Sequence, residues 1–174
     1  IAQGADENKR HRAHNKDMET VQRPLAESKL TGRSANKVLF EKYIICEDGF
    51  GNLYDEKGEC TGFQLKVRLP YYRGVRLSLI DDLRITVDGK TYPRSSITVT
   101  LGVDTFTLDQ MLTMWNYYWK FGQIGTVTVH CTKDFERMIS SDCNKVEVGI
   151  DLRIAYADFN VNTSKMVRRT VNHG

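Results

Sequence analysis

The sequence has little of what builds a catalytic centre. Among its 174 residues are four histidines, and only one of them, His130, lies away from the two ends of the chain. Its four cysteines match no zinc-binding spacing and include no Cys-x-x-Cys pair. Gly-x-Ser-x-Gly and the glycine-rich phosphate-binding motifs are missing as well. The sequence therefore presents neither a metal cluster nor a recognisable nucleophile.

Long apolar runs are also absent, which argues against two further classes of protein. No stretch of about 18 apolar residues is available to span a membrane, and the apolar core of a secretory signal is not found near the first residue. We therefore expect a cytoplasmic protein whose cysteines are buried free thiols. The alternative is a disulfide, either Cys46–Cys60 or Cys131–Cys143.

The chain has a small excess of positive charge, and this excess lies at one end. The formal net charge is +3, because residues 1–37 carry eight Lys/Arg against five Asp/Glu and the rest carries seventeen of each. A small net charge without a clustered basic face argues against nucleic-acid binding. Residues 1–37 also contain no aromatic residue. We predict a polar, basic N-terminal arm over 1–37, a β domain over 38–159 and a loop-like tail over 160–174.

The most informative stretch, Thr61–Asp82, contains two alternating runs separated by a corner. In its first half apolar residues alternate with polar ones, which is typical of a half-buried strand. The apolar residues are Phe63, Leu65, Val67 and Leu69. Pro70 ends this strand because proline has no N–H to donate to a sheet. The corner Tyr71–Gly74 follows, and alternation resumes over Val75–Ile80. We expect an aromatic and cationic corner between two strands, where ligands and partners often bind.

Further strands are predicted along the rest of the chain. They are Val38–Cys46, Leu83–Val87, Ile97–Leu101, Thr126–Cys131 and Val146–Tyr156. The last is the longest and is placed at the centre of a sheet, and Asp88-Gly89 predicts a hairpin. Phe106–Met114 is expected to form one or two helical turns, with Thr107 or Asp109 near the start. Together these patterns predict an all-β fold, an antiparallel β-sandwich of about eight to ten strands with one short helix and an extended N-terminal arm.

Polar-tipped aromatic residues are unusually concentrated in two places. Tryptophan and tyrosine combine a large contact area with a hydrogen-bonding group, which suits interfaces and sugar faces. We therefore predict a substrate pocket or partner interface in these two places. Its residues are Pro70, Tyr71, Tyr72, Arg73, Gly74, Trp115, Tyr117, Tyr118 and Trp119. The alternative is that Trp115 and Trp119 simply fill one end of the sandwich.

The other titratable residues have simpler interpretations. His130 alternates with Val129 and Cys131, so we expect it on the surface rather than as a ligand or base. Adjacent carboxylates are expected to be solvated acids in turns. They are Glu47-Asp48, Asp55-Glu56 and Asp81-Asp82.

Several segments, taken in order, resemble those of a known family. The first, Gly62–Ile80, contains Leu-Pro-Tyr-Tyr-Arg-Gly and then Leu-Ser-Leu-Ile. The others are Val87–Lys90, Phe106–Met111, Trp119–Gly122 and Leu152–Tyr156. Together they resemble the small beta subunit of bacterial C-glycoside deglycosidases. The resemblance covers Lys42 to Phe159, so it says nothing of the predicted arm and tail.

The resemblance implies a heteromeric lyase whose chemistry lies on another chain. In these enzymes a larger alpha subunit, similar to sugar-phosphate isomerases and with a TIM-barrel fold, holds a divalent metal that we expect to be manganese. The substrate is a C-glycoside, such as a flavonoid C-glucoside, already oxidised at C3 of the sugar. A base removes the C2 proton and the bond to the aromatic carbon breaks by elimination. Such enzymes occur in gut and soil bacteria that degrade plant glycosides.

For this chain the resemblance implies an accessory role without catalytic residues, metal ligands or a cofactor. Its expected partners are the alpha subunit and, within the complex, the 3-oxo-C-glycoside, in a hetero-oligomer with several copies of each subunit. It is expected to stabilise the alpha subunit and to complete the pocket. Two other classes remain as alternatives: a stand-alone carbohydrate-binding module, and a structural interaction domain whose basic arm wraps a partner.

Overall fold

The fold is taken from a computed structural model of the chain. It describes residues 41–131, 139, 141–154 and 157–170, without the side chains of residues 157–159. The chain divides into two units, Ile1–Asn36 and Lys37–Gly174, and the described residues belong to the second. The predicted arm, the first residues of the predicted strand Val38–Cys46 and the last four residues of the chain lie outside this description.

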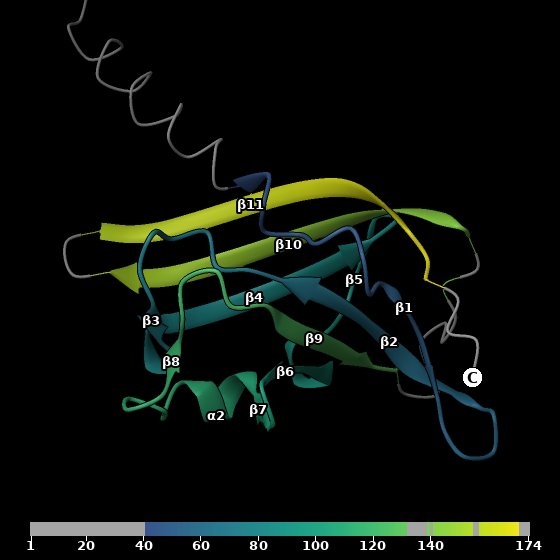
Figure 1. Cartoon of the computed structure of the whole chain (residues 1–174), viewed down its shortest axis with the longest axis horizontal. Helices are drawn as coiled ribbons and strands as arrows, with labels where there is room; N and C mark the ends of the chain where they lie inside the picture. The colour runs from purple at the N-terminus through teal and green to yellow at the C-terminus, as the bar shows by residue number, and fades with distance from the viewer. Residues whose placement is uncertain (1–40, 132–138, 140, 155–156, 171–174) are drawn as a thin grey trace, which may run out of the picture. The chain divides into compact units, whose positions relative to one another are not determined.

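The described residues form eleven strands and one short α-helix, and every strand pair is antiparallel. Five strands pair in the order β1-β2-β9-β6-β7, four in the order β11-β10-β4-β5, and two as β3-β8 (Figure 1). The strands are β1 (Gly51–Tyr54), β2 (Cys60–Val67), β3 (Val75–Arg76), β4 (Ile80–Val87), β5 (Lys90–Thr91), β6 (Ile97–Leu101), β7 (Asp104–Thr107), β8 (Tyr118–Trp119), β9 (Gly125–His130), β10 (Cys143–Ile154) and β11 (Ala157–Arg168). The all-β fold is confirmed with slightly more strands than predicted, and the sandwich arrangement stays a prediction.

The core is one cluster of buried side chains to which both larger sheets contribute. Successive side chains of a strand point to opposite faces, so alternating apolar residues give each sheet one apolar face. On β2 the buried residues are Phe63, Leu65 and Val67. On β10 they include Val146, Val148, Ile150 and Leu152. β10 lies between β11 and β4, as predicted for the longest run. Removing these apolar faces from water is the main favourable term in folding.

Two local features agree with the sequence patterns. The helix α2 (Leu108–Met111) begins after Thr107, whose hydroxyl accepts a hydrogen bond from the Gln110 backbone N–H at 3.1 Å. Gln110 Oε1 accepts one from the Thr107 N–H at 2.9 Å, which completes a capping box. Asp88 and Gly89 join β4 to β5 with φ angles of 49° and 83°. Positive φ at both central residues suits the twist of a two-residue hairpin.

The predicted loop-like tail is wrong, because β11 is a long strand that pairs with β10 from end to end. Val161 and Val167 of β11 are buried, whereas Asn160, Asn162 and Ser164 are exposed. Between the two valines, the half-buried positions are held by Thr163 and Lys165 instead of apolar residues. Because these two inward-facing positions are polar, apolar and polar residues do not alternate along β11, and the sequence pattern does not indicate a strand.

The predicted strand Val75–Ile80 is also wrong in its second half. β3 ends at Arg76 and a 3-10 turn (Leu77–Leu79) leads into β4. The Leu77 N–H donates to the Tyr117 carbonyl at 2.9 Å, and the Ser78 N–H donates to the Met114 carbonyl at 3.3 Å. These bonds go to the segment after α2, so the chain turns there although its side chains alternate.

In the described part of the predicted strand Val38–Cys46, a turn ends at Ile44 and only Ile45 makes a β-bridge, with Val67.

Cys46 is buried and Cys143 is exposed, and both are free thiols, so neither of the two alternative disulfides is formed. Burial raises the pKa of the Cys46 thiol.

Within the described residues, the helical segments are all too short or too polar to cross a membrane.

Candidate functional site

The two groups of predicted site residues, far apart in the sequence, are joined by the β3–β8 pair. Val75 lies opposite Trp119, and Arg76 lies opposite Tyr118. β3 and β8 lie together at one end of this unit, next to α2 (Figure 1). The structure thus places the corner after Pro70 and the aromatic run after α2 on the same part of the molecule.

The corner itself passes from the core to the surface. Pro70 is buried, Tyr71 packs against the core, and Tyr72 is 54% exposed. The two tyrosine rings are 4.6 Å apart at their centroids, and the Arg73 guanidinium lies 5.1 Å from the centre of the Tyr72 ring. An ideal Cβ added to Gly74 would be 3.2 Å from the Trp119 carbonyl oxygen. A residue without a side chain therefore allows the corner to approach β8 closely.

The two tryptophans have different roles. Trp119 is only 1% exposed and its indole N–H donates to the Gln123 carbonyl at 2.9 Å. Gly125 makes room for the ring, because an ideal Cβ there would lie 2.4 Å from Trp119 Cζ2. Trp115 is 68% exposed. Of the two tryptophans that the alternative places inside one end of the sandwich, only Trp119 is buried.

Tyr117 is half-buried and held by hydrogen bonds, so it is not one of the exposed aromatic side chains. Its hydroxyl oxygen lies 2.9 Å from Asp104 Oδ2 and 3.2 Å from the Leu101 carbonyl oxygen. Its ring packs edge-on against Phe106, with 4.9 Å between centroids. The hydrogen bond to the Asp104 carboxylate, together with partial burial, raises the pKa of Tyr117, because ionisation would place two negative charges side by side.

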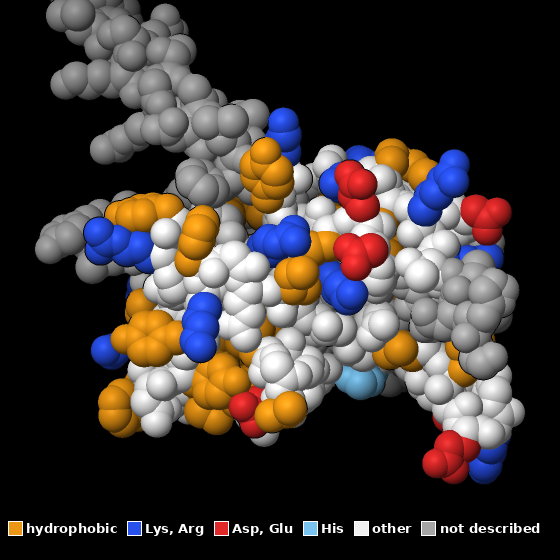
Figure 2. Space-filling model, viewed as in Figure 1, with side chains coloured by type: hydrophobic (Ala, Val, Ile, Leu, Met, Phe, Trp, Pro, Cys, Tyr) orange, Lys and Arg blue, Asp and Glu red, His pale blue; other side chains and the backbone are white. Residues whose placement is uncertain are grey.

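The exposed part of the site is a group that we call the aromatic surface: Tyr72, Trp115, Tyr118 and Phe121. Each of these side chains is at least 45% exposed. Figure 2 shows hydrophobic and Lys/Arg side chains next to one another at the end where Figure 1 places β3 and β8. Large aromatic groups gathered on a surface mark interaction sites more often than chance exposure does.

Sequence reasoning missed Arg76 and Phe121. Arg76 Nε donates to the Tyr118 hydroxyl oxygen at 2.7 Å, and its guanidinium lies 5.5 Å from the centre of that ring. A signal was present, since Arg76 alternates with the buried Val75 and Leu77 and must point outward. Phe121 follows β8 directly and is 61% exposed.

The histidine of the body and the paired carboxylates Asp81 and Asp82 lie outside the two segments that carry this surface. His130 is exposed on β9, as predicted, and its Nε2 is 2.9 Å from the Thr98 hydroxyl oxygen. Asp81 and Asp82 belong to the start of β4 and not to a turn, and both form ion pairs with arginines. Three or more His, Cys, Asp or Glu side chains suited to a metal do not gather anywhere among the described residues.

Comparison with known proteins identifies a family to which the chain is similar. The family described as C-glycoside deglycosidase beta subunit matches residues 40–156. Three curated relatives bear the same name. The protein from Eubacterium cellulosolvens is 42% identical over 79 residues, which are 45% of this chain and 54% of that protein. The one from Arthrobacter globiformis is 34% identical over 65 residues, or 37% of this chain and 49% of that protein.

The third relative, from Microbacterium trichothecenolyticum, is 32% identical over 93 residues, which are 53% of this chain and 66% of that protein. The chain thus spans about half to two thirds of the length of these relatives. The family match, in contrast, extends from residue 40 to residue 156 and covers both the corner and the aromatic run. The chain therefore belongs to the C-glycoside deglycosidase beta subunit family.

Proposed function

We propose that this chain is the accessory subunit of a heteromeric C-glycoside deglycosidase, and that the aromatic surface is where it contacts its alpha subunit. The observation that carries the proposal is the exposure of Tyr72, Trp115, Tyr118 and Phe121 in a member of this family. An exposed aromatic group of this kind is stabilised when a partner covers it. Assembly with a second subunit supplies such a cover.

The proposed complex cleaves the C–C bond between a 3-oxo sugar and a flavonoid-type aglycone, as a lyase of plant-derived glycosides. The ketone at C3 makes the C2 proton acidic, so a base removes it. A double bond then forms between C1 and C2, the bond from C1 to the aromatic carbon breaks, and that carbon takes up a proton as the aglycone leaves. We assign the base and a divalent metal, manganese in our proposal, to a TIM-barrel alpha subunit. This chain stabilises that subunit, and part of the aromatic surface borders the pocket, where flat aglycones stack on aromatic rings.

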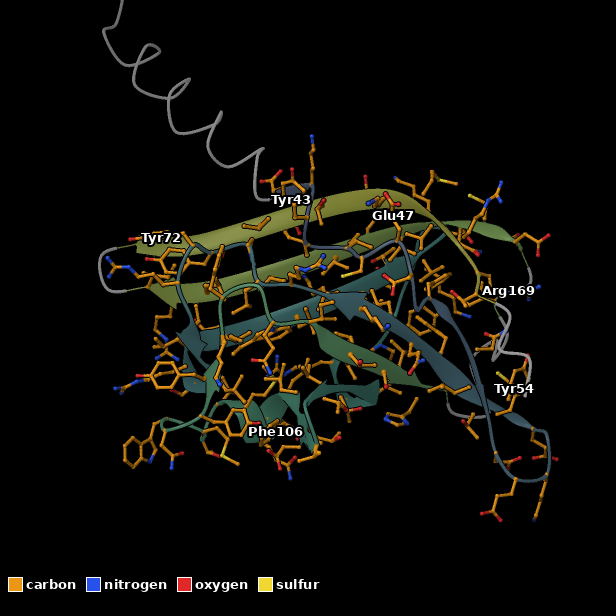
Figure 3. The ribbon with its side chains drawn as sticks, viewed as in Figure 1. Tyr43, Glu47, Tyr54, Tyr72, Phe106 and Arg169 are labelled. Carbon is orange, nitrogen blue, oxygen red and sulfur yellow. The ribbon has the colours of Figure 1, made fainter. Side chains whose placement is uncertain are left out.

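The test is the paired substitution Tyr72→Ala and Trp115→Ala. Truncating two exposed aromatic side chains of this surface should weaken binding of the alpha subunit by about 100-fold or more, because buried aromatic anchors carry most of an interface's binding energy. Co-purification of the two subunits and turnover of a 3-oxo-C-glycoside measure the effect. The matched control is Tyr54→Ala, since Tyr54 is 53% exposed and lies at the other end of this unit from Tyr72 (Figure 3).

Unchanged assembly and turnover in the doubly substituted protein would contradict the proposal, provided that its circular dichroism matches the wild type.

A carbohydrate-binding module is the second candidate, because Trp115, 68% exposed, could stack on a sugar ring. That candidate requires the isolated chain to bind glycosides in calorimetry and its native mass to remain that of the chain alone. A cytoplasmic location also stays a prediction.

A further inference from the structure

The segments that carry the aromatic surface contain positively charged residues and no negatively charged ones. The two segments that build it, residues 68–76 and 112–124, contain no Asp or Glu. Their cations are Arg68, Arg73, Arg76 and Lys120. The last three are exposed, whereas Arg68 is half-buried and donates to the Cys46 sulfur at 3.2 Å. This one-sided charge is notable because the chain beyond residue 37 has equal numbers of acidic and basic residues.

The arginines here are partnered differently from most others in the described part of the chain. Four arginines elsewhere pair with aspartates, whereas Arg168 is exposed on β11 without an ion pair to a described carboxylate. The four are Arg84, Arg94, Arg153 and Arg169. Arg73 and Arg76 lie over tyrosine rings, and none of the described carboxylates forms an ion pair with either of them. An arginine stacked on an aromatic ring is held in a fixed orientation with its outer N–H groups available.

The hydrogen-bonding groups of Arg76 and Tyr118 define what fits against them. Arg76 uses Nε to donate to the Tyr118 hydroxyl oxygen, so both terminal nitrogens of its guanidinium remain as donors. The Tyr118 hydroxyl accepts that bond and keeps its own hydrogen to donate. Both side chains therefore offer donors to an incoming group. A carboxylate, which only accepts and matches the guanidinium fork with two oxygens, satisfies this arrangement.

The carboxylates that precede or follow these two segments in the sequence are engaged by other residues. Asp104 accepts from Tyr117, Asp109 pairs with Arg94, and Asp81 pairs with Arg153. Covering Arg73 or Arg76 with an apolar partner surface would remove the charge from water without compensation, which is costly. Any partner that buries these residues must therefore bring its own acceptors.

We propose that the aromatic surface docks on an acidic and apolar face of the alpha subunit, whose carboxylates bind Arg73, Arg76 and Lys120; this inference rests on the proposed function. Protein carboxylates suit the site better than nucleic-acid phosphates, because three exposed cations on a body of balanced charge make too small a basic footprint for a phosphate backbone. Charge steers the subunits together, and the aromatic rings supply the buried area.

The experiment measures binding of the wild-type chain and of Arg73→Glu, Arg76→Glu and Lys120→Glu to the alpha subunit in about 50 and 500 mM NaCl. Wild-type association should slow by about tenfold at high salt, and Arg76→Glu should weaken binding by about tenfold or more at low salt. The substituted proteins should also depend less on salt. Lys57→Glu, in the exposed turn between β1 and β2, is the matched control and should change neither quantity.

Three outcomes contradict the inference in distinguishable ways. If the wild-type chain forms no complex at low salt, the proposed function itself fails. If a complex forms but neither salt nor charge reversal alters its affinity, the proposed function stands and the acidic docking face is wrong. If affinity is unchanged while the KM for the glycoside rises, the cations face the substrate rather than the alpha subunit, and the inference is again overturned.

Discussion

At the scale of single residues, identity alone does not separate a buried aromatic side chain from an exposed one. Trp115 and Trp119 stand in the same aromatic run, yet one is exposed and the other is buried. Gly125 accounts for the buried one, since it leaves the space into which the Trp119 ring fits. That space is formed by residues of another strand, so no local pattern around Trp119 reveals it. The sequence predicted that these residues matter, and tertiary contacts decided which one reaches the surface.

Tyr117 gives a prediction about alkaline pH. Its pKa is raised from an ordinary value of 10.0 by the hydrogen bond to Asp104, so the folded state holds this proton more tightly than the unfolded state does. The stability that it contributes is therefore fully present below the unfolded pKa and is lost as pH rises through the folded pKa. Tyr117→Phe should cost about 1 kcal/mol of unfolding free energy at pH 7 and should make the decline of stability above pH 10 less steep.

Urea midpoints measured between neutral and alkaline pH check this expectation, with Tyr54→Phe as the control for the loss of one tyrosine. Parallel curves for the wild type and Tyr117→Phe across the alkaline range would show that the Asp104 bond does not hold the proton.

At the scale of elements, strands with one apolar face were predictable and those without one were not. β2, β6, β9 and β10 follow clear alternation and were recognised, and the capping residues of α2 and the Asp88-Gly89 turn were read from local chemistry alone. β11 was missed because its inner face includes polar residues. Its pairing comes from the neighbouring strand β10, which is information that the tail sequence does not contain.

Arg84 on β4 connects this strand to β10 and β11 through side-chain hydrogen bonds on their outer face. Its guanidinium donates to Asp151 at 2.5 and 3.0 Å, to Asp82 at 3.0 Å and to Asn162 at 3.4 Å, and it lies over Gly149. The two carboxylates raise the pKa of Arg84 further, so its charge is permanent. Arg84→Ala leaves the two aspartates facing each other and should cost about 1 to 2 kcal/mol, a value kept small because the site is partly open to solvent.

Chemical denaturation of Arg84→Ala, of Asp151→Ala and of the double variant measures this coupling as a mutant cycle. Arg168→Ala, on the exposed face of β11, is the control and should change stability little. An additive double variant would mean that the pair contributes nothing beyond its separate parts.

At the scale of the whole molecule, the two tryptophans report separately on core and surface. The chain contains only these two, and Trp115 lies on the aromatic surface while Trp119 is in the core. We expect acrylamide to quench Trp115 strongly in the isolated chain and much less once the alpha subunit is bound. Trp115→Phe should leave a blue-shifted emission from Trp119 that neither acrylamide nor the alpha subunit changes.

Emission spectra and quenching constants with and without the alpha subunit test this expectation. Persistent quenching of Trp115 in a complex of confirmed mass would show that the alpha subunit binds elsewhere on the chain.

The β3–β8 pair joins Arg76 to Tyr118 across 42 positions of the chain. Neither segment alone presents both members of the pair, so the complete aromatic surface forms only once that long loop has closed. If the alpha subunit binds this surface as we propose, it contacts both segments at once. It would then bind folded chains in preference to incompletely folded ones, so that assembly selects for chains that have completed folding.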